Sequence, residues 1–224
     1  MQIMKEYEYT LEYFPKFDSG ITGFLKSDHK DDIEKAEKFL NKYWLDKSEY
    51  DSVWKPVQDY IFHAKQRRKG TIFKDDFTLI VAKGGQLFWP ERFEKFKAFI
   101  SAMGEENFVV VHNVNELNTP LFRLKFPVDI TWDEMMSGDY VSAFLCGFPC
   151  EEYMLYGKSR KWGRYAGNDF AFPLDMYAFE QEYANVFDEI FKISKQERRE
   201  LYENDRFHLP QAYKDLIKKQ GDIL

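Results

Sequence analysis

The chain has 224 residues, of which 44% are hydrophobic and 31% are charged. This composition is typical of a folded domain with its own core and excludes a chain that is disordered throughout. No run of about 18 apolar residues occurs, and the first residues lack the apolar segment of a signal peptide. The two cysteines, Cys146 and Cys150, are too few for a disulfide scaffold. We therefore expect a cytoplasmic protein that does not enter a membrane.

The net charge of −6 is concentrated in the middle of the chain. Residues 126–191 contain 12 acidic side chains, only four basic ones and 16 of the aromatic residues. Acidic groups next to aromatic rings suit a surface that captures a basic partner, because charge steers the encounter and ring area anchors it. A solvated acidic face over an aromatic core explains the same composition. The negative charge argues against nucleic acid as the partner.

The first part of the chain predicts one strand and two helices. Residues 7–14 are rich in strand-forming side chains and predict the start of a sheet. Apolar residues at helical spacing predict a helix over 33–44 and a second helix over 53–64. Pro56 fits the first turn of the second helix if Ser52 caps it, because the first turn has no intrahelical N–H bonds to lose.

A hairpin, a helix and a buried strand are predicted next. Residues 77–88 contain two apolar runs around Gly84-Gly85, which favours a hairpin. An apolar stripe predicts a helix from Pro90 to Gly104. Residues 107–112 include four consecutive apolar side chains, which indicates a central strand buried on both faces. The Asn-rich segment 113–120 is the one candidate domain boundary, and since it is short we expect a single domain over 1–224.

The last third mixes strands and short helices. A capping box between Thr131 and Glu134 opens a short helix that ends at Gly138. Further strands are predicted over 121–126, 140–145, 152–156 and 170–177, with Lys158 to Arg164 in a loop, and closing helices follow after residues 179, 194 and 210. The order lacks a regular βαβ alternation, so the predicted class is α+β, a mixed and mainly antiparallel sheet flanked by amphipathic helices.

No catalytic or metal-binding motif stands out in the sequence. The four histidines are dispersed, and Cys146 and Cys150 have no second cysteine pair with which to form a zinc site, so we expect neither metal nor cofactor. We expect both cysteines to be free thiols in the core. An alternative hypothesis is a small hydrolase or transferase with an aromatic cleft near His112 and the turn from Cys146 to Glu152. A third is a scaffold protein without a small ligand.

Residues 130–179 carry a recognisable pattern of aromatic residues, glycines and a capping box. It reads Ile-Thr-Trp-Asp-Glu-Met-Met-Ser-Gly from Ile130, Glu-Tyr-Met-Leu-Tyr-Gly-Lys-Ser-Arg-Lys-Trp-Gly-Arg-Tyr from Glu152, and Pro-Leu-Asp-Met-Tyr-Ala-Phe from Pro173. This segment resembles the C-terminal part of immunity proteins from bacterial polymorphic and contact-dependent toxin systems. The resemblance implies a non-enzymatic protein that binds one cognate toxin and blocks it.

The acidic stretch gives the candidate partner surface. From Phe126 to Gly157 there are six acidic residues and no Lys or Arg, so no base close in sequence neutralises them. Trp162 lies within the basic segment from Lys158 to Arg164, which follows the acidic stretch. Its ring either anchors a partner or seals the hairpin. The candidate partner-binding residues are Asp133, Glu134, Asp139, Tyr140, Glu151, Glu152, Tyr153 and Trp162.

Overall fold

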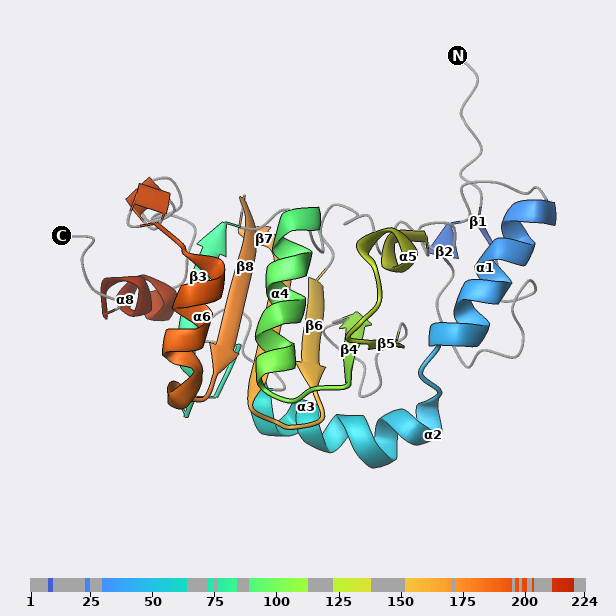
Figure 1. The fold of residues 1–224 in the computed structure, drawn as a ribbon, viewed down its shortest axis with the longest axis horizontal. Helices are drawn as coiled ribbons and strands as arrows, with labels where there is room; N and C mark the ends of the chain where they lie inside the picture. Colours follow the sequence, from blue (N-terminus) through green and yellow to red (C-terminus); the bar gives the residue numbers. More distant parts are fainter. Residues whose placement is uncertain are drawn as a thin grey trace, which may run out of the picture.

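The computed structural model describes residues 8–9, 23–24, 30–63, 72–74, 76–83, 89–112, 123–137, 152–170, 172–194, 196–197, 199–200, 203 and 211–219. In this part of the chain a six-stranded sheet forms the centre of the molecule (Figure 1). Its order is β3-β8-β7-β6-β4-β5, and every neighbouring pair is antiparallel. The predicted α+β class is confirmed.

The strands of this sheet are β3 (Thr78–Lys83), β4 (Asn107–His112), β5 (Arg123–Pro127), β6 (Glu152–Gly157), β7 (Trp162–Phe170) and β8 (Phe172–Phe179). A separate short pair joins β1 (Glu8–Tyr9) to β2 (Gly23–Phe24). The helices are α1 (Lys30–Tyr43), α2 (Lys47–Glu49), α3 (Lys55–Ile61), α4 (Pro90–Ala102), α5 (Trp132–Met136), α6 (Ala184–Phe191) and α8 (Gln211–Lys219). A π-helix, η1 (Tyr50–Trp54), connects α2 to α3, and a 3₁₀ turn, η3 (Gln181–Tyr183), precedes α6.

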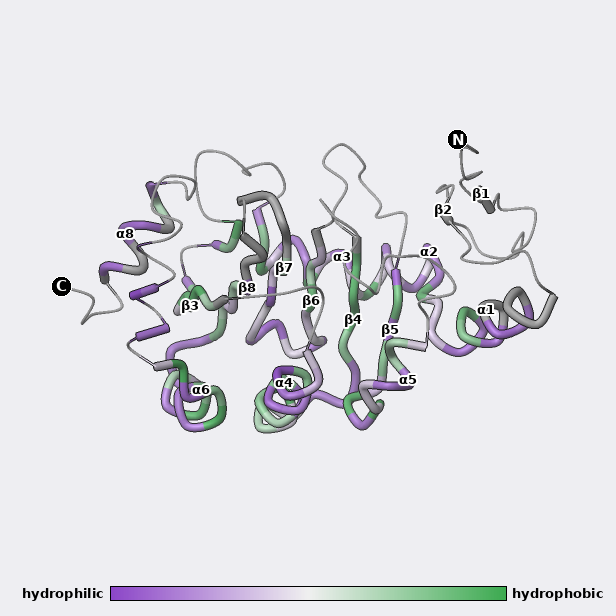
Figure 2. Tube along the Cα trace, turned by 90° about the horizontal axis from the view of Figure 1, so that it is seen from above, coloured by the Kyte–Doolittle hydropathy of each residue, from purple (hydrophilic) through white to green (hydrophobic). Residues whose placement is uncertain are grey.

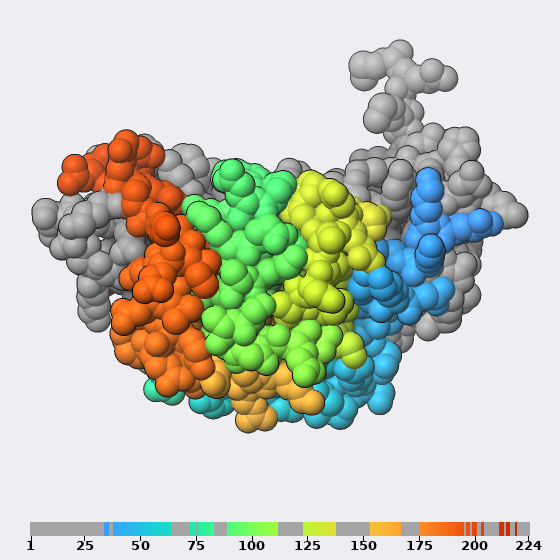
Figure 3. Space-filling model, in the orientation of Figure 1, coloured from blue at the N-terminus to red at the C-terminus, as the bar shows by residue number. Residues whose placement is uncertain are grey.

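Helices cover both faces of the sheet (Figure 2). On one face α4, α5 and α6 lie side by side, as the space-filling view also shows (Figure 3). On the other face lie η1 and α3. Successive side chains of β4 alternate between the two layers: Phe108 and Val110 join the first core, whereas Val109 and Val111 join the second. The prediction that 107–112 is an interior strand buried on both faces is confirmed.

Two helices begin where the sequence predicts, α4 at Pro90 and α5 after Thr131, whereas the predicted end of α5 at Gly138 lies outside the described residues. Pro90 opens α4, and the helix buries Phe93, Phe96 and Phe99 against the sheet. Gly104, with φ of +78°, follows its last turn in a left-handed conformation that glycine adopts without strain. In α5 the Thr131 side chain accepts a hydrogen bond from the backbone N–H of Glu134 at 3.1 Å.

The predicted start of the second helix is wrong. The chain is already helical from Lys47, where the Asp46 carboxylate caps α2 by accepting from the N–H of Glu49 at 2.9 Å. Ser52 is no cap, because its hydroxyl donates to the Ser48 carbonyl inside the helical segment. Pro56 is tolerated because it lies in the first turn of α3, directly after the π-helix.

The prediction that Lys158 to Arg164 form a loop is also wrong. The turn covers only 158–161, and β7 begins at Trp162. Arg164 therefore lies inside the sheet, where its Nε donates to Asp175 Oδ1 of β8 at 2.5 Å, with both side chains 2% exposed. The sequence did not reveal β7 because a buried arginine is unusual in a strand, and its partner Asp175 lies on the next strand of the hairpin.

Several predictions fall outside the described residues. These are the strand over 140–145, the hairpin turn at 84–85 with residues 86–88, and both cysteines, Cys146 and Cys150. The candidate boundary 113–120 lies there too, and the strands on either side of it, β4 and β5, pair directly with each other. Among the described helices, none is both long and apolar enough to cross a membrane.

Candidate functional site

Two of the predicted partner-binding residues lie together on the surface at α5. Asp133 is exposed and its carboxylate has no partner within the described ranges. Glu134 accepts hydrogen bonds from the Lys42 ammonium and the Tyr43 hydroxyl of α1. These two bonds hold the pKa of Glu134 below its ordinary value. Glu134 therefore fastens α1 to α5, and Asp133 remains available to a partner.

Tyr153 and Trp162 do not lie on the surface, and the prediction that they contact a partner is wrong. Tyr153 is 2% exposed and Trp162 is fully buried, both in the core beneath α4. The reason is their position on interior strands, β6 and β7, where alternate side chains point into a helical layer. The ring of Trp162 packs edge-on against Phe96 at a centroid distance of 5.3 Å, so it seals the core.

The remaining candidates cannot be assigned to a surface. Asp139, Tyr140 and Glu151 lie outside the described residues. Glu152 is the first residue of β6 and pairs with Gly167 of β7, but only its backbone is described.

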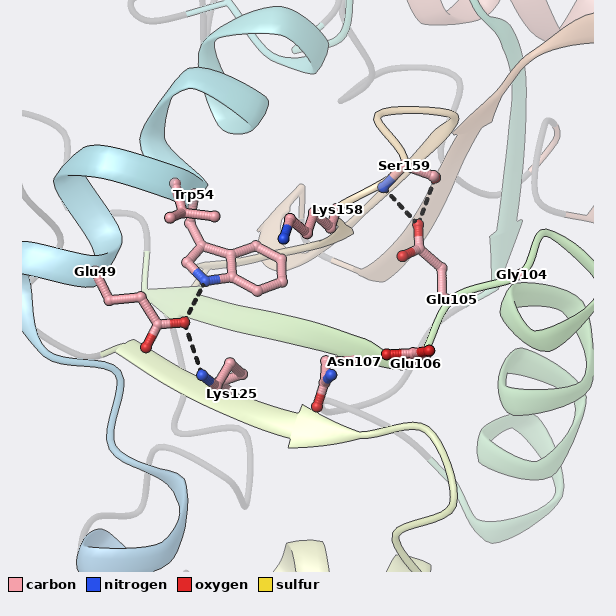
Figure 4. A pocket seen from close by; sticks show the side chains of 10 residues that line it. Glu49, Trp54, Gly104, Glu105, Glu106, Asn107, Lys125, Lys158 and Ser159 are labelled. Carbon is pink, nitrogen blue, oxygen red and sulfur yellow. Dashed lines mark hydrogen bonds and ion pairs between the residues drawn. The ribbon is translucent and has the colours of Figure 1, made fainter.

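A pocket of about 480 Å³ opens at the end of the sheet where β4 begins (Figure 4). Its lining comes from η1, the turn between α4 and β4, strand β5, and the turn between β6 and β7. The pocket lies at the opposite end of β4 from His112. It is therefore not the aromatic cleft that the enzyme hypothesis places near His112 and Cys146 to Glu152.

One wall of the pocket is built around Glu49, at the junction of α2 and η1. Its Oε1 accepts from Lys125 Nζ at 2.7 Å and from the indole Nε1 of Trp54 at 3.1 Å. Burial alone would raise the pKa of Glu49, but the bonds from Lys125 and Trp54 outweigh burial, and the pKa is lowered. Glu49 and Lys125 thus neutralise each other.

The opposite wall is built around Glu105, which is only 9% exposed. Its Oε1 accepts from the Trp162 indole Nε1 at 3.0 Å, from the Ser159 N–H at 3.1 Å and from the Ser159 hydroxyl. Gly157 leaves room for this carboxylate, because a Cβ at that position would lie 2.1 Å from it. Within the described ranges no Lys, Arg or His forms an ion pair with Glu105. Its charge is therefore balanced by neutral donors alone.

Three further polar side chains line the pocket without a partner among the residues that the structure describes: Glu106, Asn107 and Lys158. Glu106 and Lys158 are exposed, and Asn107 is half-buried at the start of β4. The backbone carbonyl of Glu106 accepts from the N–H of Val128 at 2.9 Å, which joins this turn to the one that leads into α5. Three exposed acids lie on these two turns and in the first turn of α5, and we call this set the acidic corner: Glu106, Asp129 and Asp133.

None of the pocket residues stands out in the sequence as a site. The one local signal is Gly104-Glu105-Glu106, a helix-ending glycine followed by two acids and then a buried strand. Such a pattern places two carboxylates just before the first residue of a strand, at one end of the sheet. Glu49 and Lys125 are 76 positions apart, and Glu105 and Trp162 are 57 apart, so their pairing needs the folded sheet.

The arrangement is suited to binding a donor-rich group. Glu105, Glu106 and Asn107 offer oxygen acceptors, and Lys158 is the one lining base that is not already paired with a described residue. No group of three or more His, Cys, Asp or Glu side chains that could hold a metal ion occurs among the described residues.

Fold and pocket together define an α+β protein with a polar, partly acidic cavity at one end of a two-sided sheet. Comparison of the sequence with protein-family models, with curated proteins and with solved structures found no match.

Proposed function

We propose that the chain is a non-enzymatic binding protein of the immunity type, which acts in the cytoplasm and neutralises a basic toxin by covering its active site. The observation that carries the proposal is the acidic corner. Glu106 and Asp129 are exposed carboxylates on two turns that a backbone hydrogen bond joins, and Asp133 is exposed in the first turn of α5. None of the three side chains has a partner within the described ranges. A surface of this kind attracts a cationic protein and can take the place of the phosphates that a nucleic-acid-cleaving toxin would bind.

The acidic corner stands on a well-packed support. Val128 and Ile130 are buried on either side of Asp129, and Met135 of α5 is fully buried against the same core. The capping bond from Glu134 N–H to Thr131 fixes the first turn of α5, where Asp133 lies. Preorganised charges lose little conformational entropy on binding, which favours a tight and fast association.

The test uses the basic protein encoded next to this chain in its genome, if a toxin domain is found there. Co-expression of the two proteins is expected to restore growth, and the purified pair is expected to form a stoichiometric complex. Asp129→Lys with Asp133→Lys should slow association by at least about tenfold at low ionic strength and flatten its dependence on salt. Glu91→Lys, an exposed acid at the start of α4, is the matched control and should change association little. If co-expression does not restore growth, the proposal is overturned. It is also overturned if the double reversal leaves the association rate unchanged.

A further inference from the structure

Glu105 is a buried carboxylate whose donors among the described residues are all neutral groups. Its three hydrogen bonds come from an indole, a backbone amide and a hydroxyl, and all reach Oε1. Oε2 accepts no bond from the described residues, and Figure 4 shows this oxygen turned away from Ser159, into the pocket. Three donors compensate Oε1, as a buried carboxylate requires. Oε2 is therefore the acceptor left open to a ligand in the pocket, and a charged donor would bind it more strongly than a neutral one.

The neighbouring groups extend this acceptor set. Glu106 and Asn107 follow Glu105 directly, and both line the same pocket without a described partner. Two carboxylates and an amide oxygen on one turn match a planar group with several N–H donors. Arginine presents five such donors in a fixed fork, whereas lysine presents a compact ammonium.

The opposite wall is shaped by an uncommon element. Val53 and Trp54 belong to the π-helix η1, and they line the pocket together with Glu49. Short π-helical segments are rare and frequently occur at functional sites. Here the extra residue in the turn places the Trp54 indole where it donates to Glu49, so Glu49 and Lys125 stay paired with each other. This wall therefore contributes shape and little net charge.

We propose that the pocket receives the guanidinium group of an arginine side chain presented by the basic partner, an inference that rests on the proposed function. The guanidinium pairs with Glu105 Oε2 and with Glu106, and Asn107 accepts a further donor. Lys158 does not block entry, because its side chain is exposed and its ammonium can remain in water. The acidic corner steers the partner, and the pocket holds one of its arginines.

The experiment titrates the full chain, labelled with ¹⁵N at the tryptophan indoles, with Nα-acetyl-arginine amide. The indole N–H groups of Trp162 and Trp54 donate to Glu105 and Glu49, so their resonances report on the two walls. Trp89, which is 52% exposed and lies outside the pocket, serves as the internal reference. We expect a saturable shift at Trp162, a smaller one at Trp54 and none at Trp89. Nα-acetyl-lysine amide should bind several-fold more weakly, and the neutral isostere Nα-acetyl-citrulline amide should not bind.

Glu106→Gln is the first variant, because the side chain is exposed and the fold does not depend on it. It should weaken binding of the arginine probe by at least about fivefold, and Glu91→Gln should leave binding unchanged. Glu105→Gln keeps a carbonyl for the Trp162 indole and removes the charge, so it should abolish binding. If Glu105→Gln fails to fold, the wild-type titration and Glu106→Gln still decide the question.

The outcomes separate the pocket from the proposed function. A shift that does not saturate, or that is equal for arginine and citrulline probes, overturns the guanidinium site. A partner complex that tolerates Glu106→Gln and Glu105→Gln but not the Asp129→Lys, Asp133→Lys reversal also overturns it, and leaves the proposed function standing. Saturable, charge-dependent binding of the probe without any complex with the basic neighbour supports the pocket and removes the proposed function.

Discussion

Two glutamates on opposite walls of the pocket each accept an indole N–H, but among the described residues only one of them is paired with a cation. Glu49 is paired with Lys125, and about a third of each side chain is exposed. Glu105 is 9% exposed and is held by Trp162 and Ser159, both neutral. The same interaction, an indole N–H that donates to a carboxylate, therefore occurs twice. At Glu49 a lysine also pairs with the carboxylate, whereas at Glu105 no described base does.

The difference separates a structural pair from a receptive one. In an ion pair such as Glu49–Lys125 each charge is neutralised by the other, so neither requires a charged ligand. A carboxylate whose described donors are all neutral and reach one oxygen leaves the other oxygen to a ligand, as a binding site for a cation needs. If the two glutamates differ in this way, variants at each of them will differ in stability and packing.

The largest effect is expected at Glu105. Glu105→Ala leaves the indole N–H of Trp162 buried without an acceptor and releases Ser159, which should lower the free energy of unfolding by about 3 kcal/mol. Glu49→Ala should cost less, about 1–2 kcal/mol, because the Glu49–Lys125 pair is partly exposed and screened, and the Trp54 indole bond that is also lost is only partly buried. Urea unfolding of both variants measures the difference. Equal losses would mean that the two walls do not differ in the way proposed.

Gly157→Ala tests the packing of Glu105 from the other side. The new Cβ would lie 2.1 Å from the carboxylate, which sits at the end of a flexible side chain and would move away from Ser159 and Trp162. We expect a loss of about 2 kcal/mol that shrinks markedly in the Glu105→Ala background, because both changes break the same bonds. Gly104→Ala is the control: its Cβ meets nothing within 4 Å, so it should show only the cost of a positive φ, in either background.

The predictable part of this fold is the part encoded by local pattern. The stripe of α4, the Thr131 cap of α5 and the four apolar residues of β4 each fix an element within a few neighbouring positions. Strand β7 was not predictable in this way, because Gly163 and Arg164 are poor strand signals taken alone. Glycine is required at position 163, because a Cβ there would lie 2.6 Å from the Ile61 side chain and 2.9 Å from the Phe62 ring. The burial of Arg164 in the strand is explained by its ion pair with Asp175 of β8.

The candidate site was less predictable than the fold. Composition indicates acids in the middle of the chain, and Asp133 does lie on an exposed turn. Tyr153 and Trp162, however, are buried and do not belong to that surface. Which face of the sheet a strand residue points to depends on the pairing register, which composition does not reveal. The pocket combines residues from η1, β4, β5 and the turn after β6, so only the sheet order brings them together.

Acid titration should reveal how much Lys125 contributes to stability through Glu49. The pKa of Glu49 is lower in the folded chain than its ordinary value of 4.5, so its ionised form is favoured by folding. The pair therefore adds stability above the ordinary pKa, and this contribution is lost as the pH falls through the lowered, folded-state pKa. Lys125→Met, which keeps the hydrocarbon stem, should flatten this acid loss of unfolding free energy between about pH 6 and 3. An unchanged acid slope in Lys125→Met would show that Lys125 does not set the pKa of Glu49.

The smallest effect on stability is expected at Asp129 and Asp133, the two residues of the acidic corner that do not line the pocket. Asp129→Lys and Asp133→Lys alter exposed carboxylates that have no partner within the described ranges, so each should change the free energy of unfolding by less than about 1 kcal/mol. Glu134→Lys, one residue further along α5, removes the acceptor of the Tyr43 hydroxyl and faces Lys42 with a like charge, so it should destabilise the fold more than Asp133→Lys does. Thermal and urea unfolding of the three variants measure this order. If Asp133→Lys proves as costly as Glu134→Lys, the acidic corner is part of the internal ion-pairing of the fold, and its charges are not held in reserve for a partner.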